Sequence, residues 1–306
     1  MAGGLAAGAL AVMAAVLLRR GRIERAEDRR TVAAVEKAAA VARSSTADAC
    51  GARWLLVIDF ECTCIRDSIY YRKTPWLHEI IEFPVVAVDL LELERTGTVD
   101  VFSAPYFHRF VRPTEKPRLT EFCTALTGIE QSTVDAAQTL DVVVREFGEW
   151  LEARGLDSAA TSGDSCFLLA TDGAWDMRKF LLAECKRKHL DLPRRFQRWV
   201  DVALHLTKFY AMRRCNLEKK LLNVGLRFQG RPHSGLDDAR NIARLAVKLF
   251  RDGCALVVND GWGEDRVVPQ SRSSDERRAA QLQAKKRAAH AATLRLRAPK
   301  HVEVDW

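Results

Sequence analysis

The sequence lacks the cysteine patterns of a zinc site. Its eight cysteines are spread over positions 50 to 254, with no CxxC pair and no zinc-ligand spacing. No internal repeat is evident either. We therefore expect reduced, mostly buried thiols in a chain whose folded part occupies a reducing compartment.

Strong bias in composition is also missing, which excludes a wholly disordered chain. The 306 residues are 48% hydrophobic and 29% charged, so a folded core is expected, most simply one domain with extensions. Lys and Arg number 48 against 40 acidic residues, a formal charge of +8. This excess favours a polyanionic partner, such as nucleic acid or an acidic membrane surface.

The N-terminus has no charged side chain from Met1 to Leu18 and then continues into Arg19 and Arg20. We interpret residues 1–22 as an apolar anchor or targeting segment. The basic flank fits an anchor that leaves the protein facing the cytosol. The clustered arginines, with no acidic residue before Glu24, also fit mitochondrial import, and a neutral helix of a cytoplasmic protein is the third reading.

The rest of the chain divides by composition into three parts. Residues 23–52 are predicted to form a charged helical linker, residues 53–260 a folded domain, and residues 261–306 a basic tail. Hydrophobic periodicity in the domain indicates strands at Trp54–Phe60, Ile80–Leu91, Val99–Val111 and Cys166–Ala170, the first three as a meander. Helices are expected at Leu119–Leu126, Leu140–Arg154, Trp175–Lys188, Leu217–Val224 and Asp237–Phe250.

Two carboxylates stand at the end of the first expected strand. Alternation along a strand places Asp59 and Glu61 on the same face, where they repel unless a cation neutralises them. Mg²⁺ and Mn²⁺ prefer such oxygen ligands. Alone, the pair is equally compatible with a solvated strand end.

Two further acidic elements lie where an expected helix begins. Asp172 and Asp176 follow a strand, and His233, Asp237 and Asp238 precede an apolar helix. Each element has a structural alternative, because aspartates commonly cap helices and a histidine beside them is commonly a hydrogen-bonded structural group. Their shared position at strand ends and helix starts, where loops present reactive groups, favours a common site.

Taken in order, these elements resemble the three motifs of the DEDDh 3′-to-5′ exonuclease superfamily. The chain is most similar to its Eri-type exoribonuclease branch, which includes the histone-mRNA and siRNA exonucleases. The resemblance covers about residues 53 to 260 and is carried by Val57–Cys64, His78–Pro84, Leu126–Ile129, Thr171–Met177 and Gly230–Arg244. It implies an α/β ribonuclease H-like fold, a mixed five-stranded sheet flanked by helices.

Carried over by position, the resemblance assigns the site. The implied metal ligands are Asp59, Glu61, Asp176 and Asp238. The implied catalytic residues are His233, as general base, and Glu61. The implied contacts to the terminal nucleotide are Glu61, Cys62 and Met177. Alanine is the expected residue at Cys62. Asp172 is expected beside the ligands without binding metal, and Asp237 is expected to cap the following helix.

The activity implied is metal-dependent hydrolysis that releases nucleoside 5′-monophosphates from single-stranded RNA 3′ ends. Two Mg²⁺ ions, with Mn²⁺ as a substitute, would be required, and no small-molecule cofactor. Two alternatives stay open: a DNA-directed exonuclease, and a catalytically silent nucleic-acid-binding scaffold on the same fold. An association with membranes through residues 1–18 is compatible with each.

Overall fold

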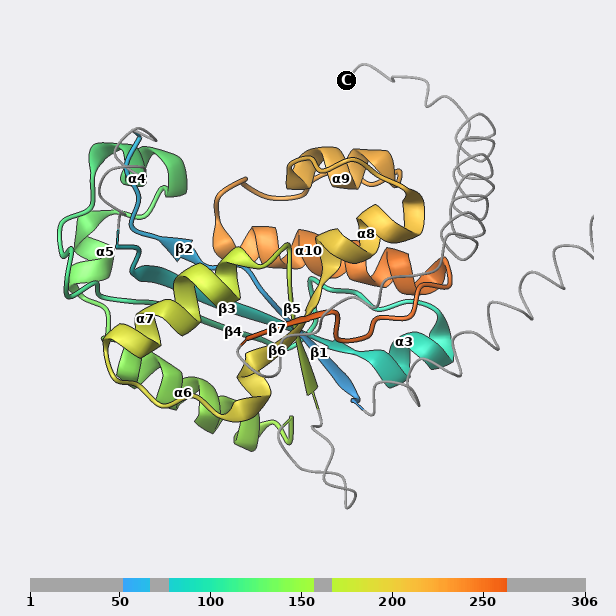
Figure 1. The fold of residues 1–306 in the computed structure, drawn as a ribbon, viewed down its shortest axis with the longest axis horizontal. Coiled ribbons are helices and arrows are strands. Elements are labelled where there is room, and N and C mark those ends of the chain that lie inside the picture. Colours follow the sequence, from blue (N-terminus) through green and yellow to red (C-terminus); the bar gives the residue numbers. More distant parts are fainter. Residues whose placement is uncertain (1–51, 67–76, 157–166, 263–306) are drawn as a thin grey trace, which may run out of the picture.

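The computed structural model describes residues 52–66, 77–156 and 167–262 (Figure 1). The predicted N-terminal segment, nearly all of the linker and residues 263–306 of the tail lie outside this range, so the predictions for them stay predictions. Among the described residues, no helix is both long enough and apolar enough to cross a membrane.

The centre of the domain is a mixed β-sheet. Its longer strands are β1 (Trp54–Ile58), β3 (Ile80–Asp89), β4 (Tyr106–Phe110), β5 (Phe167–Thr171) and β6 (Arg198–Asp201). The two-residue strands β2 (Glu61–Cys62) and β7 (Asp260–Gly261) bring the sheet to seven strands within the described residues, in the order β2-β3-β1-β5-β6-β7 with β4 paired to β3. β1 runs antiparallel to β3 and parallel to β5, which confirms the predicted meander and the mixed sheet.

Helices cover both faces of the sheet (Figure 1). On one face lie α3 (Leu90–Thr96), α8 (Val202–Tyr210), α9 (Leu217–Asn223) and α10 (Gly235–Arg251), with one hydrophobic cluster. On the other face lie α6 (Leu140–Ala153), η1 (Asp176–Leu181) and α7 (Leu182–Arg187), with a second cluster. The remaining helices are α4 (Glu121–Thr127), α5 (Gln131–Asp135) and η2 (Arg194–Gln197). Because both faces of the sheet are covered, the side chains on both sides of β1 and β3 are buried, and the two strands are continuous runs of mostly apolar residues.

Three predicted strands were too long, and the first of them ends at Ile58 and not at Phe60. β3 ends at Asp89 because this side chain accepts the N–H of Glu92 (3.1 Å) and so caps α3, a helix that the periodicity did not indicate. The segment predicted as a strand from Val99 is strand only from Tyr106, since Asp100 accepts hydrogen bonds from Phe102 N–H and from the Ser103 hydroxyl and turns the chain.

Further segments were not predicted as regular structure: α5, β6, α8, the short η2 and the two-residue strands β2 and β7. β6 and α8 meet at Asp201, whose carboxylate accepts the N–H of Leu204 at 2.7 Å and starts α8 directly after the strand. Four of the six cysteines in the described range are buried, as expected: Cys62, Cys123, Cys185 and Cys254.

Candidate active site

Parallel pairing of β1 and β5 brings the first two acidic elements together. The two strands are in register from Trp54 with Phe167 to Val57 with Ala170, so their carboxyl ends reach the same edge of the sheet. Asp59 follows β1, and Asp172 and Asp176 follow β5. The backbone N–H of Phe60 donates to Asp176 Oδ1 at 2.9 Å, which links the two elements directly.

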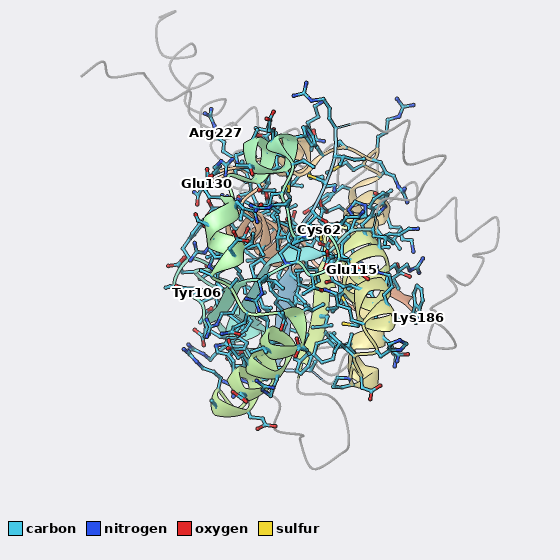
Figure 2. All side chains as sticks on the ribbon, turned by 90° about the vertical axis from the view of Figure 1, so that its left-hand side faces the viewer. Cys62, Tyr106, Glu115, Glu130, Lys186 and Arg227 are labelled. Carbon is cyan, nitrogen blue, oxygen red and sulfur yellow. The ribbon has the colours of Figure 1, made fainter. Side chains whose placement is uncertain are left out.

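The third element arrives on α10. Side-chain oxygen or nitrogen atoms of Glu61, His233 and Asp238 all lie within 4.8 Å of one another, close enough to share a metal ion or a reacting group. His233 is exposed and has a left-handed backbone (φ 61°), whereas Asp238 is buried at the start of the helix. The cluster thus combines buried carboxylates with one solvent-facing imidazole. In Figure 2, which looks onto this end of the molecule, the neighbouring Cys62 lies near the middle of the view.

The carboxylates of the cluster have pKa values far from those of exposed acids. Burial, and then the charges of Asp176 and Asp238, raise the pKa of Asp59 well above its ordinary value. Burial, with Asp238 as the leading charged neighbour, raises the pKa of Glu61 to about 9. Burial also raises the pKa of Asp176 and of Asp238, each to about 7. Because the charges of Asp176 and Asp238 contribute to the shifts of both Asp59 and Glu61, the four carboxylates lie in one electrostatic cluster.

The start of α10 is held in place by the sheet. Glu82 on β3 is buried, and its carboxylate accepts the N–H groups of Gly235 (3.0 Å) and Leu236 (3.3 Å). His108 on β4 contacts the same carboxylate at 2.8 Å. A Cβ at Gly235 would lie 2.7 Å from the carbonyl oxygen of Asp59, so only glycine allows this close approach of α10 to the end of β1.

Glu82 was missed as a functional residue by the sequence analysis. The available signal was an acid inside the apolar strand Ile80–Asp89, within a segment that carries the resemblance. Asp237 was expected to cap α10, and this was wrong. Its carboxylate accepts the N–H of Arg231 at 2.9 Å in the loop before the helix, while Glu82 takes the N–H groups of the first turn.

The other predicted residues lie beside the cluster. Asp172 pairs with Lys220 on α9 (2.6 Å), and its charge raises the pKa values of Asp59, Asp176 and Asp238. Cys62 and Met177 are buried in the core between the sheet and η1. Their contact with a nucleotide stays a prediction.

The residues fit divalent metal ions. Four carboxylates supply oxygen donors of the kind that Mg²⁺ and Mn²⁺ prefer. The repulsion that raises their pKa values is the repulsion that bound cations relieve. Within the described part of the chain, Glu61, His233 and Asp238 form the one group of three potential ligands that lie close enough to hold an ion.

Comparison with known proteins agrees with this geometry. The sequence model of the exonuclease family RNase_T matches residues 56–246. The "3'-5' exoribonuclease 1" of Rattus norvegicus is 38% identical over 209 residues, which are 68% of this chain and 56% of the relative. The "3'-5' exonuclease Snipper" of Drosophila melanogaster is 38% identical over 217 residues, 67% of this chain and 72% of the relative.

Solved structures give the same class. The nuclease domain of 3′hExo, described as a DEDDh family member bound to rAMP, is 35% identical with a TM-score of 0.60 over 69% of this chain and 98% of that one. A structure of the recognition of the histone mRNA stem-loop by 3′-exonuclease is 33% identical, with a TM-score of 0.62 over 73% of this chain and 71% of that one.

The fold and the acidic site define a nuclease domain of the DEDDh class with a ribonuclease H-like sheet. The chain belongs to the exonuclease family, with Eri-type 3′-5′ exoribonucleases among its relatives. This confirms the predicted family and fold class. The chain spans just over half of the length of the rat exoribonuclease that it matches.

Proposed function

We propose that this protein is a metal-dependent 3′-to-5′ exoribonuclease that releases nucleoside 5′-monophosphates from single-stranded RNA 3′ ends. The observation that carries the proposal is the convergence of Glu61, His233 and Asp238 within 4.8 Å, in one electrostatic cluster with Asp59 and Asp176. A solvated strand end or a set of helix caps gives no reason for three separate segments to bring buried acids to one point.

In this proposal the carboxylates of Asp59, Glu61, Asp176 and Asp238 hold two Mg²⁺ ions. The ions supply neutralisation of the phosphate charge and of the developing negative charge on the attacking and leaving oxygens. Asp176 is held in position by the N–H of Phe60, and Asp238 by the first turn of α10. The oxygen ligands are thus oriented before an ion binds, which reduces the reorganisation needed during the reaction.

His233 acts as general base and accepts the proton of the attacking water. Its exposed imidazole stands at the solvent side of the buried carboxylates, where a water and a scissile phosphate have access. Imidazole is suited to proton transfer near neutral pH. The product is a nucleoside 5′-monophosphate, because attack on the phosphorus displaces the 3′ oxygen of the preceding nucleotide.

RNA is the proposed substrate because the similar proteins include exoribonucleases. One similar structure is that of a 3′-exonuclease in 3′-end recognition of the histone mRNA stem-loop. Single strands are bound mainly through backbone charge and base stacking. Among aromatic residues that could stack on bases, Tyr106 is exposed, whereas Phe107 and Trp199 lie in the core.

The test is trimming of 5′-labelled single-stranded RNA and of the matched DNA, with Mg²⁺, with Mn²⁺ and with EDTA. We expect a metal-dependent ladder of shortened RNA that is lost in Asp59→Ala and His233→Ala. Equal or faster shortening of DNA would contradict the choice of sugar. Binding without cleavage of either polymer would contradict catalysis and support the scaffold.

A further inference from the structure

Lys220 is a buried cation next to the proposed metal centre. It lies on α9, a short helix beside α10 (Figure 1), and is only 9% exposed. A lysine is almost never buried in this way unless its charge is paired. Its ammonium pairs with Asp172 Oδ2 at 2.6 Å. α9 is fixed in this position because Leu221, the next residue, packs fully buried into the cluster under α10.

Asp172 is a fifth carboxylate within reach of the site. Its charge contributes to the shifted pKa values of Asp59, Asp176 and Asp238, three of the four proposed ligands. Its second oxygen, Oδ1, is buried and has no hydrogen-bond partner among the described residues. Without a neighbouring cation, Asp172 is chemically equivalent to the ligands and stands directly at the end of β5, between Thr171 and the η1 helix.

We propose that Lys220 neutralises Asp172 and so keeps it out of the metal-ligand set. The centre then has four ligand carboxylates, whose charge matches that of two divalent cations, and the adjacent ammonium offsets part of the charge of the fifth acid. Lys220 is thus a positioning residue that sets the affinity of the site for divalent metal. This inference rests on the metal centre of the proposed function.

The ion pair of Lys220 with Asp172 lies where its charges act mainly on the proposed metal ions. Asp201, the other acid whose pKa responds to both Asp172 and Lys220, already accepts the N–H of Leu204 as the cap of α8. Lys220 therefore has Asp172 as its ion-pair partner, and removal of either member leaves one uncompensated charge beside the cluster. The two removals leave charges of opposite sign.

The experiment is titration of the metal-free full chain with Mn²⁺ by calorimetry, so that no RNA cleavage is needed. Lys220→Met leaves the Asp172 carboxylate uncompensated and is expected to tighten binding roughly tenfold, whereas Asp172→Asn leaves the Lys220 ammonium uncompensated and is expected to weaken it by a similar factor. The double variant, with neither charge, returns close to wild type, and so does Lys220→Arg, which keeps the cation.

The matched control is the ion pair of Lys248 with Asp252 at the far end of α10. Lys248→Met and Asp252→Asn are expected to leave Mn²⁺ affinity unchanged. A pair with a merely structural role loosens the fold in both single variants, so Lys220→Met and Asp172→Asn would then shift affinity in the same direction or not at all. Either result overturns the inference.

Failure of the proposed function is distinguishable from failure of the inference. A wild-type chain that binds no Mn²⁺ overturns the metal centre and the inference with it. A wild-type chain that binds Mn²⁺, with variants that do not shift in opposite directions, overturns only the role of Lys220. Should Lys220→Met not fold, Asp172→Asn decides alone: weaker binding in a folded protein supports the role, and unchanged binding overturns it.

Discussion

Two buried groups of acids lie close together in this domain and are treated in opposite ways. The proposed ligand cluster of Asp59, Glu61, Asp176 and Asp238 has no lysine or arginine paired with it among the described residues, and its carboxyl pKa values are raised. In the second group, Lys188 donates to Glu79 (2.8 Å) and Glu184 (2.6 Å).

Glu79 is fully buried, yet its environment is complete. Burial alone would raise the pKa of Glu79, but N–H groups of Thr114, Glu115 and Lys116 and the Lys188 ammonium hold it below its ordinary value. Glu184 in turn accepts the N–H of Ile80 at the start of β3. The difference teaches that burial of an acid says little by itself. A closed set of donors that includes a cation indicates structure, and an acid cluster without a paired lysine or arginine indicates a site for added cations.

The strongest test of this difference is Asp238→Asn. We expect activity to fall about 10³-fold, since the loss of one ligand removes several kcal/mol of charge stabilisation. The metal-free protein is expected to unfold at the same temperature as wild type or higher, because one of four repelling carboxylates is gone. Thermal denaturation and RNA trimming measure the two effects. Asp252→Asn, on the same helix, is the control, and strong destabilisation by Asp238→Asn would contradict the comparison.

The reverse test is Lys188→Met in the closed group. Loss of this cation leaves two buried carboxylates unpaired, and we expect destabilisation of about 3–5 kcal/mol. Chemical denaturation measures it. Activity per folded molecule is expected to persist, because Lys188 contacts none of the proposed ligands. The exposed Lys186 of α7, labelled in Figure 2, gives the control Lys186→Met. Exposed ion pairs contribute up to about 1 kcal/mol. A Lys188→Met protein that loses no more than this would place Lys188 among ordinary surface cations.

The two groups also differ in how stability depends on pH. The folded-state pKa values of Asp176 and Asp238, about 7, exceed the ordinary value of an aspartate in the unfolded chain, so the folded state binds more protons between these limits. The metal-free protein is therefore expected to lose several kcal/mol of stability as the pH rises from about 4 to about 7. Saturating Mg²⁺ should remove most of this slope in thermal denaturation. A metal-free protein that gains stability over this range would show that the ligand carboxylates are not mutually destabilising.

The sequence predicted the ligand positions better than it predicted what supports them. Asp59, Glu61, Asp176, His233 and Asp238 were proposed because each occupies a short local pattern at an element boundary and the patterns together resemble the family's motifs. Their convergence depends on the parallel register of β1 with β5 and on the docking of α10, which are contacts between distant segments.

Supporting residues gave weaker signals. Lys220 sits among other charged residues of α9, and only the packing of that helix makes it buried. α3 and α8 were missed because they begin at caps supplied by the last residues of strands, Asp89 inside the longer predicted strand and Asp201 in a strand that was not predicted. Asp237 was assigned the cap of α10 because nothing local identifies Glu82, 153 residues earlier than Gly235, as the acceptor.

The smallest effect is expected at that acceptor, which belongs to neither acidic group but holds α10 against the sheet. Glu82→Gln keeps one carbonyl oxygen for the N–H groups of Gly235 and Leu236 but loses the charge that interacts with the helix N-terminus and with His108. We expect destabilisation of about 1–2 kcal/mol. Because His233 and Asp238 lie on either side of this turn, activity per folded molecule should fall about tenfold, in kcat more than in KM. Glu92→Gln, at the exposed start of α3, serves as the control. Full activity in a destabilised Glu82→Gln protein would show that the first turn of α10 positions itself without the sheet.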